Sequence, residues 1–187
     1  MNRQDRRVVS REYFSEERLA EHHFRSFNNF LERGMQDVVT EKERIETDIG
    51  DKEGEEPVFV ELGDVRVETP RVREADGSEE LLFPQEARLR NITYAAPVFM
   101  EMSIVRGGEE EEEVVVDTTE TKVGRMPIMV GSSKCNIAEL SDEDLVEIGE
   151  DPVDPGGYFI VNGSERVLMT SEDLAPNKIL AEYDTKY

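Results

Sequence analysis

The hydrophobic periodicity of this chain changes between residues 39 and 58. From residue 19 to residue 39 apolar side chains recur at spacings of three and four, which predicts a helix over residues 13–39 that begins near Ser15 and is weakened or divided at Gly34. Beyond residue 57 apolar and polar residues alternate, which indicates strands. We therefore expect an α+β fold, in which an N-terminal helical arm (residues 1–49) precedes a mostly antiparallel β domain (residues 50–187). Residues 50–57 are charged and turn-like, and form the expected linker.

Turn signals divide the β domain into short strands. Gly63 and Asp64 predict a turn between two of them. The five consecutive glutamates at 109–113 predict a solvated loop or hairpin tip, with an acidic patch that binds a partner as the alternative. Ser141 and the acidic residues after it predict a short helix that ends at Gly149. The expected strands cover residues 58–62, 65–67, 98–105, 114–117, 125–130, 158–161 and 166–170.

Acidic residues outnumber basic ones, with 44 Asp and Glu against 22 Lys and Arg and a formal net charge of -22. In dilute buffer such an excess destabilises the compact state by self-repulsion. At molar salt the Debye length falls to about 3 Å, from about 10 Å at 0.1 M, and the repulsion is largely screened. The acid is spread along the whole chain and only six residues are Lys. We interpret this composition as adaptation to a salty cytoplasm; an acidic protein that binds a basic partner is the alternative.

Neither a targeting segment nor a membrane span is predicted. The residues from Met1 to Arg7 are mostly polar, and no apolar run follows them. No apolar run approaches the roughly 18 residues that a membrane-spanning helix requires. We therefore expect a soluble, cytoplasmic protein. The lone Cys135 excludes an internal disulfide and a cysteine-based zinc site, and is expected to be a small buried side chain.

The residues alone indicate no catalytic or metal site. His22 and His23 are the two histidines, and neighbours on a helix point about 100° apart, so the pair should not ligate one ion. The 44 carboxylates are too many for one catalytic acid pair to be selected. Because both histidines lie in the arm, no Ser/His/Asp set can be argued. We assign no catalytic residue, no metal ligand and no bound cofactor.

The stretch DPGGYFIVNGSERV at 154–167 is the best-specified local structure. Its glycines superficially suggest a phosphate loop, but the Walker spacing and its Lys are absent. The residues from Pro155 to Gly157 instead predict a turn into a buried strand. Asn162 and Gly163 form the type I′ signal that reverses this strand. We therefore expect a β-hairpin here.

The same stretch, extended to DPGGYFIVNGSERVL at 154–168, closely resembles a signature of the second-largest subunit of multisubunit RNA polymerases. Three further stretches match this family in the same order: SFNNF at 26–30, PQEARLRNITY at 84–94, and GRMPIMV at 124–130 with Cys135. EADG at 74–77 also fits. The resemblance covers residues 10–187. It is strongest to the archaeal and eukaryotic branch, and to the archaeal B″ form, in which this subunit is split into two chains.

This resemblance implies an N-terminal part of the second-largest subunit of a DNA-directed RNA polymerase. It would hold a helical region and the first, incomplete segment of the domain called the protrusion, which flanks the upstream side of the cleft. The implied partners are the largest subunit, the rest of the second-largest subunit, template DNA and the RNA–DNA hybrid. In this family the catalytic Mg²⁺ is held by another subunit, so the chain alone is expected to be inactive as a nucleotidyltransferase. A free-standing acidic protein-interaction module that shares the fold is the alternative.

In the family the segment after the hairpin turn borders the channel that holds the RNA–DNA hybrid. Carried over, the candidate nucleic-acid-binding residues are Arg166, Met169, Thr170, Ser171 and Asn177. A glutamine usual after the turn appears here as Ser171, next to Glu172 and Asp173, which weakens a direct contact by Ser171. From the residues alone, the alternative is that Arg166 pairs with Glu165 or Glu172 on a solvated hairpin.

Overall fold

The structure is a computed structural model, and it describes residues 3–16, 19–42, 44–47, 57–107, 114–169, 171–174, 176–177 and 181. The helical elements are α1 (Arg3–Glu16), α2 (Glu21–Asn29), the π-helical turn η1 (Phe30–Gly34), α3 (Met35–Thr40), α4 (Pro84–Leu89) and α5 (Asp142–Glu147). The strands are β1 (Arg44–Glu46), β2 (Val58–Val67), β3 (Arg71–Arg73), β4 (Glu79–Leu81), β5 (Ala95–Arg106), β6 (Val114–Pro127), β7 (Phe159–Val161) and β8 (Ser164–Arg166). The expected linker at 50–57 and the glutamate run at 109–113 lie outside the described residues, apart from Pro57.

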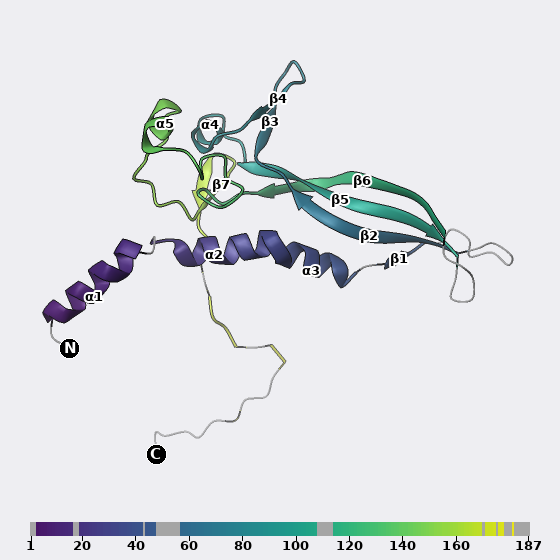
Figure 1. The fold of residues 1–187 in the computed structure, drawn as a ribbon, viewed down its shortest axis with the longest axis horizontal. Coiled ribbons are helices and arrows are strands. Elements are labelled where there is room, and N and C mark those ends of the chain that lie inside the picture. The colour runs from purple at the N-terminus through teal and green to yellow at the C-terminus, as the bar shows by residue number, and fades with distance from the viewer. Residues whose placement is uncertain are drawn as a thin grey trace.

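A long, twisted antiparallel sheet dominates the molecule. Its strand order is β1-β2-β5-β6, and two separate hairpins, β3-β4 and β7-β8, stand at one end of it. The segments α2, η1 and α3 form one rod that runs along the sheet beside β2, whereas α1 projects away from it (Figure 1). The predicted α+β class is therefore confirmed. The expected boundary at residues 49 and 50 stays a prediction.

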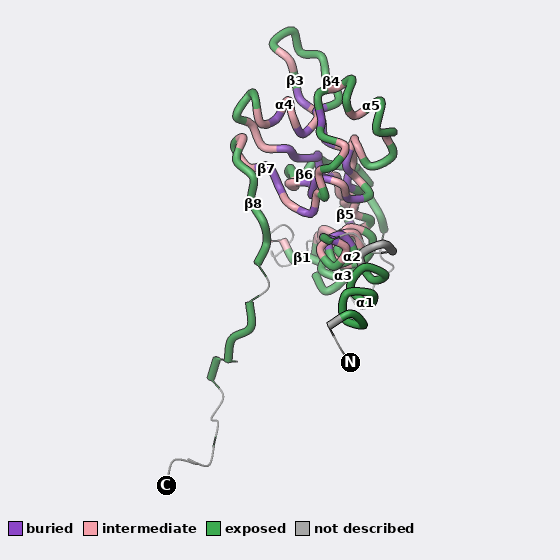
Figure 2. The backbone as a smooth tube through the Cα atoms, turned by 90° about the vertical axis from the view of Figure 1, so that its left-hand side faces the viewer, coloured by how far each residue is buried: buried purple, intermediate pink, exposed green. Residues whose placement is uncertain are grey.

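The hydrophobic core lies where the rod, α4, the hairpin β7-β8 and the near end of the long sheet meet. The buried segments gather in this region, and the described residues after β8 are exposed (Figure 2). Six core residues have no exposed surface: Leu82, Ala87, Tyr94, Ala96, Ile128 and Ile160. Phe24 and Phe27 of the arm belong to the same cluster, so the core joins the arm and the β domain into one packed unit.

The helix predicted over residues 13–39 is wrong in its start. Ser15 lies in α1, and a new helix, α2, begins at Glu21. The start of α2 is set by packing, because Phe24 and Phe27 are buried in the common core. The helix was predicted to be weakened or divided at Gly34. It is not divided there, but its α-helical geometry gives way to a π-helical turn that ends at Gly34.

The predicted turn at Gly63 and Asp64 is also wrong. β2 is a single strand with a bulge between Leu62 and Val65, where its register against β5 shifts. The side chain of Gln36 on α3 satisfies the backbone groups that the bulge frees: its Nε2 donates to the Gly63 carbonyl at 3.3 Å, and its Oε1 accepts from the Val65 amide at 2.9 Å. A side chain from the rod therefore stabilises a bulge where the local sequence favours a turn.

Other strand boundaries differ from those expected. Residues 114–127 form one strand, β6, where two were predicted, and Ile128 to Val130 lie outside it. β8 ends at Arg166, although a strand over 166–170 was predicted. The hairpin β3-β4 and the helix α4 were not predicted. In contrast, α5 is confirmed, with a capping box between Ser141 and Asp144.

None of the described helices has the length and apolar character needed to cross a membrane.

Candidate nucleic-acid interface

The four stretches that carry the family resemblance converge around the hairpin β7-β8. The Tyr94 amide donates to the Ile160 carbonyl at 3.0 Å, and the Val130 amide donates to the Tyr158 carbonyl at 2.8 Å. On the rod, the ring of Phe27 packs edge to face against the ring of Phe159, with centroids 5.3 Å apart. Each stretch therefore holds another one in place, which explains in structural terms why all four occur together.

The turn of this hairpin has the predicted type I′ form. Asn162 and Gly163 have φ values of 50° and 75°, and Val161 pairs with Ser164 across the turn. The Asn162 amide donates to Thr93 Oγ1 at 3.1 Å, and the Gly163 amide donates to the Ile92 carbonyl at 3.1 Å. The tip is thus anchored on the loop after α4, so the hairpin is a rigid scaffold for the exposed side chains of β8.

An ionic network around Arg88 holds the other end of the hairpin. Arg88 pairs with Glu150 at 3.2 Å and with Glu165 at 3.0 Å, and its Nη2 donates to Tyr158 Oη at 2.5 Å. The Tyr158 hydroxyl donates in turn to Asp154 Oδ2. Burial and this contact with Asp154 raise the pKa of Tyr158, so its hydroxyl stays protonated near neutral pH. One arginine on α4 therefore joins β8 and the residue directly before β7 to the loop after α5.

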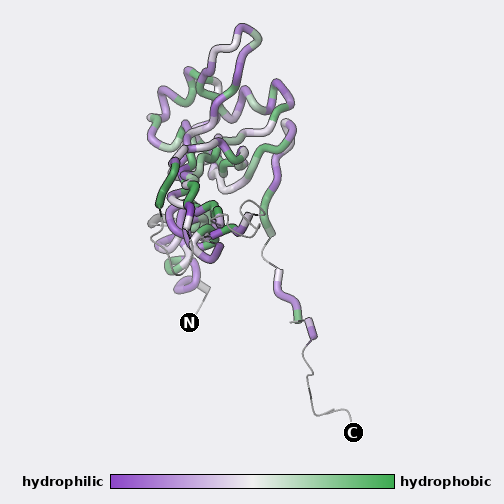
Figure 3. Tube along the Cα trace, turned by 90° about the vertical axis from the view of Figure 1, so that its right-hand side faces the viewer, coloured by the Kyte–Doolittle hydropathy of each residue, from purple (hydrophilic) through white to green (hydrophobic). Residues whose placement is uncertain are grey.

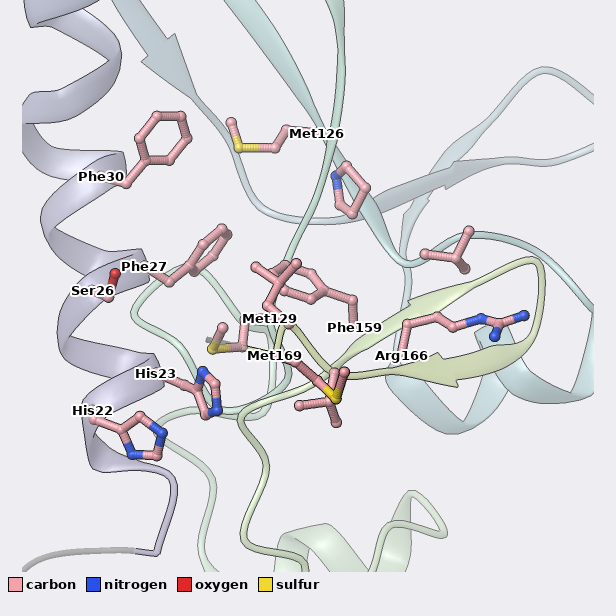
Figure 4. A pocket seen from close by; sticks show the side chains of 14 residues that line it. His22, His23, Ser26, Phe27, Phe30, Met126, Met129, Phe159, Arg166 and Met169 are labelled. Carbon is pink, nitrogen blue, oxygen red and sulfur yellow. The ribbon is translucent and has the colours of Figure 1, made fainter. Parts of the chain in front are cut away.

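Arg166 is exposed at the end of β8, opposite Phe159 in the hairpin register. Its side chain extends away from α2 (Figure 4). The alternative pairing with Glu165 or Glu172 is not seen in the described part of the chain, where Glu165 instead binds Arg88. The guanidinium of Arg166 therefore has no ion-pair partner among the described residues, and it lies on an anchored strand. Nucleic-acid binding by Arg166 stays a prediction.

The other candidate residues follow β8 without forming a strand. Met169 is 87% exposed, Ser171 and Asn177 are exposed, and Thr170 lies outside the described residues. Asn177 has a positive φ of 59°, which suits a turn. The structure does not bring these residues together into one site, and their role in nucleic-acid binding remains a prediction.

An apolar groove of about 670 Å³ separates α2 from the hairpin and the segment after it. Its floor is built by Phe27, Met129 and Phe159, and Phe30 and Met126 face each other at one end (Figure 4). The hydrophobic stretch after the hairpin forms another part of its rim (Figure 3). Phe30 is 42% exposed there, so the apolar stripe of the rod is only partly covered.

The described residues contain no group of three His, Cys, Asp or Glu side chains placed to hold a metal ion. The rings of His22 and His23 lie 4.0 Å apart on α2. Cys135 is buried as predicted, with its Sγ 3.3 Å from Tyr94 Oη. Burial raises the pKa of the Cys135 thiol, so the reactive thiolate form is disfavoured and Cys135 acts as part of the core.

Comparison with known families decides the identity of the chain. A family model described as RNA polymerase beta subunit matches residues 18–182. The chain belongs to this family. The match includes α2, the sheet, α4 and the hairpin β7-β8, so the RNA polymerase beta subunit family accounts for the whole packed unit.

Several relatives in this polymerase family are archaeal proteins. The DNA-directed RNA polymerase subunit Rpo2N of Halobacterium salinarum is 84% identical over 187 residues, which are 100% of this chain and 36% of the relative. Rpo2N of Methanocaldococcus jannaschii is 44% identical over 91% of this chain and 33% of the relative. Rpo2 of Saccharolobus shibatae is 43% identical over 95% of this chain and 15% of the relative. The chain thus corresponds to an N-terminal part of the second-largest polymerase subunit, and spans about a third of the Rpo2N relatives.

Several residues that build this part of the polymerase subunit were not singled out from the sequence. Phe24 lies one position from the predicted stripe and is buried. Arg88 lies inside a matched stretch, but its partners come from residues 150 to 165. The only sequence signal for Arg88 was its position within that stretch, because an ion pair between distant segments leaves no local pattern.

The strong similarity to a Halobacterium protein leads to a prediction about salt. The thermal stability of the purified chain should rise with KCl concentration, because the charge of -22 repels itself less when it is screened. Circular dichroism melting across roughly 0.1–2 M KCl, a range that spans the screening regime, measures this. An uncharged osmolyte serves as the control. A melting temperature that is the same at both ends of the series would remove salt adaptation as the explanation of the composition.

Proposed function

We propose that this chain forms part of the cleft wall of a DNA-directed RNA polymerase, as the first segment of the protrusion, and contacts DNA and the RNA–DNA hybrid through the end of β8. The observation that supports this most strongly is that Arg166 is exposed on an anchored hairpin and has no ion-pair partner among the described residues. A guanidinium suits phosphate because its donors form a planar fork. The strong similarity to polymerase subunits favours this function over a free-standing interaction module.

The anchoring of the hairpin supports a positioning role. Its tip is bound to Ile92 and Thr93, its other end to Arg88, and its first strand to Tyr94. A contact to phosphate contributes most to affinity when the donor is held in place, because little conformational entropy is then lost on binding. We therefore expect Arg166 to help hold the nucleic acid in register, without reading its sequence.

Catalysis would be carried out by the assembled polymerase. In this proposal the chain is inactive alone, and Mg²⁺ is bound at the active site by another subunit. The net charge of -22 opposes binding of nucleic acid by the isolated chain, since non-specific affinity depends on basic charge. The largest subunit and the rest of the second-largest subunit would supply that charge, and the apolar groove beside α2 is a surface on which such partners can pack.

Arg166→Ala in the assembled polymerase tests the proposed contact. The change should shorten the lifetime of elongation complexes and reduce the slope of log affinity against log salt by about 0.9, because one phosphate is no longer neutralised. Filter binding of the polymerase to a DNA–RNA scaffold over a KCl series measures both quantities. Stability of the chain should change by no more than roughly 0.5 kcal/mol, because the residue is exposed.

Arg106→Ala is the matched control, since Arg106 is also an exposed arginine but lies at the far end of β5. It should leave the slope and the lifetime of the complex unchanged. If Arg166→Ala behaves like this control, Arg166 is a surface charge without a role in nucleic-acid binding.

A further inference from the structure

A second group of basic side chains lies outside the hairpin. Arg71 and Arg73 on β3 and Lys122 and Arg125 on β6 surround a small cavity that also has one carboxylate, Glu79, in its lining. In a chain with 44 acidic and 22 basic residues, four cations around one cavity depart strongly from the average. The cavity measures about 220 Å³. It is smaller than the roughly 300–1,000 Å³ of typical small-molecule sites, and suits a single oxyanion group better than a whole small molecule.

The charges of these four side chains are not neutralised within the described part of the chain. Arg125 Nη2 donates to the carbonyls of Arg71 and Ala95 at 2.7 and 2.9 Å, and these acceptors carry no formal charge. The Nε atom of Arg71 is buried and has no hydrogen-bond partner among the described residues. A buried donor without a partner costs free energy, so it points to a partner that binds there.

Other arginines of the chain behave differently. Arg66 contacts Glu120 at 3.0 Å and Glu68 at 2.8 Å, and Arg90 binds Glu74 at 2.5 Å and Glu86 at 2.7 Å. These arginines form ion pairs on the surface of the acidic chain. The four cations around the cavity therefore form a distinct set, held close together by β3 and β6 although like charges repel.

The cavity neighbours the region of Arg166 through shared lining residues. A neighbouring depression shares Val72, Arg73 and Arg125 with the cavity, and includes Ile92 and Thr93, the two residues that bind the hairpin tip. The same depression shares Pro127 with the groove that Arg166 lines. Neighbouring hollows therefore lie between Arg166, the hairpin tip and the four cations.

We propose that Arg71, Arg73, Lys122 and Arg125 form a phosphate-binding site for the backbone of DNA, in addition to the contact at Arg166. This site rests on the proposed function, because it requires the assembled polymerase. Its residues form a surface separate from that of Arg166. Phosphate oxygens match the charge and the forked donors of the three arginines. Because the hollows between the two places are neighbours, one nucleic acid could contact both. Binding here is independent of base sequence, because the cluster presents charges to phosphates.

The double variant Arg73→Gln with Lys122→Gln in the assembled polymerase tests this site. Both side chains are exposed, so the fold should persist. The probe is duplex DNA with a fluorescent label, and the measured quantity is affinity over a KCl series. The slope of log affinity against log salt should fall by about 1.8, or about 0.9 for each phosphate that is no longer neutralised. The charge-preserving variant Arg73→Lys with Lys122→Arg should keep most of the slope.

Lys42→Gln with Arg106→Gln is the matched control, because it removes the same charge from exposed positions away from the cavity. This control should leave the slope unchanged. An unchanged slope in the test variant would overturn the proposal. An unchanged slope together with dissociation of another subunit on gel filtration would overturn it in favour of an acidic protein partner.

The two sites can fail separately. If the double variant lowers the slope and Arg166→Ala does not, the cluster binds DNA and the proposed contact at Arg166 is wrong. The reverse result supports the contact at Arg166 and overturns the phosphate-binding site at the four cations.

Discussion

Gly157→Ala should destabilise the purified chain by roughly 2–5 kcal/mol. Gly157 has a φ of 83°, where an L side chain costs about 1–2 kcal/mol. A Cβ at this position would also overlap the side chain of Ala20, directly before α2. Such overpacking adds typically 1–3 kcal/mol. The combined effect should loosen the packing of the rod against the hairpin. Urea unfolding followed by circular dichroism in high KCl measures the decrease in stability.

Gly149→Ala separates the two causes. Gly149 has a similar φ of 81°, but a Cβ there would meet nothing within 4 Å. This control should therefore lose only about 1–2 kcal/mol, the backbone contribution. Ala20→Gly combined with Gly157→Ala should recover the part that comes from the overlap, since glycine is tolerated at a helix N-cap. Equal destabilisation by Gly157→Ala and Gly149→Ala would show that Ala20 does not require a glycine at position 157.

Arg88→Ala should cost about 3–5 kcal/mol, the destabilisation expected when one partner of a buried ion pair is removed. Glu150 is 7% exposed, and its carboxylate also accepts from the Gln85 amide at the start of α4. Without Arg88 its charge would be buried with only that donor. Asp154, Tyr158 and Glu165 would each be deprived of a partner too, and the hairpin would be free to move from α4. Chemical unfolding of the purified variant measures the cost.

Arg90→Ala is the matched control in the same segment. Arg90 follows α4 and pairs with Glu74 and Glu86, but Arg90 is exposed and both glutamates are only half-buried, so the destabilisation should be about 0–1 kcal/mol. Adding Glu150→Gln to Arg88→Ala should return part of the stability, because it removes the unpaired charge. If Arg88→Ala and Arg90→Ala destabilise the chain by the same amount, the network around Arg88 does not hold the hairpin.

The sequence by itself determined the structures whose causes are local. Asn162 and Gly163 specify the type I′ turn because both residues tolerate positive φ. Ser141 caps α5 through a residue three positions away. The change of periodicity indicates helices before strands, and so the α+β class, because each period reflects the geometry of one element. The resemblance of four short stretches was enough to indicate the polymerase family, which the family model then showed.

The tertiary structure alone decided every feature in which distant segments take part. Gly63 lies in a bulge and not in a turn, because Gln36 from the rod binds the backbone groups there. The helix α2 begins at Glu21, because Phe24 and Phe27 pack into a core built largely by later residues. The cations of β3 and β6 surround one cavity only once the chain is folded. Alternation of residues tells which side chains share a face, but it does not tell which segment lies against that face.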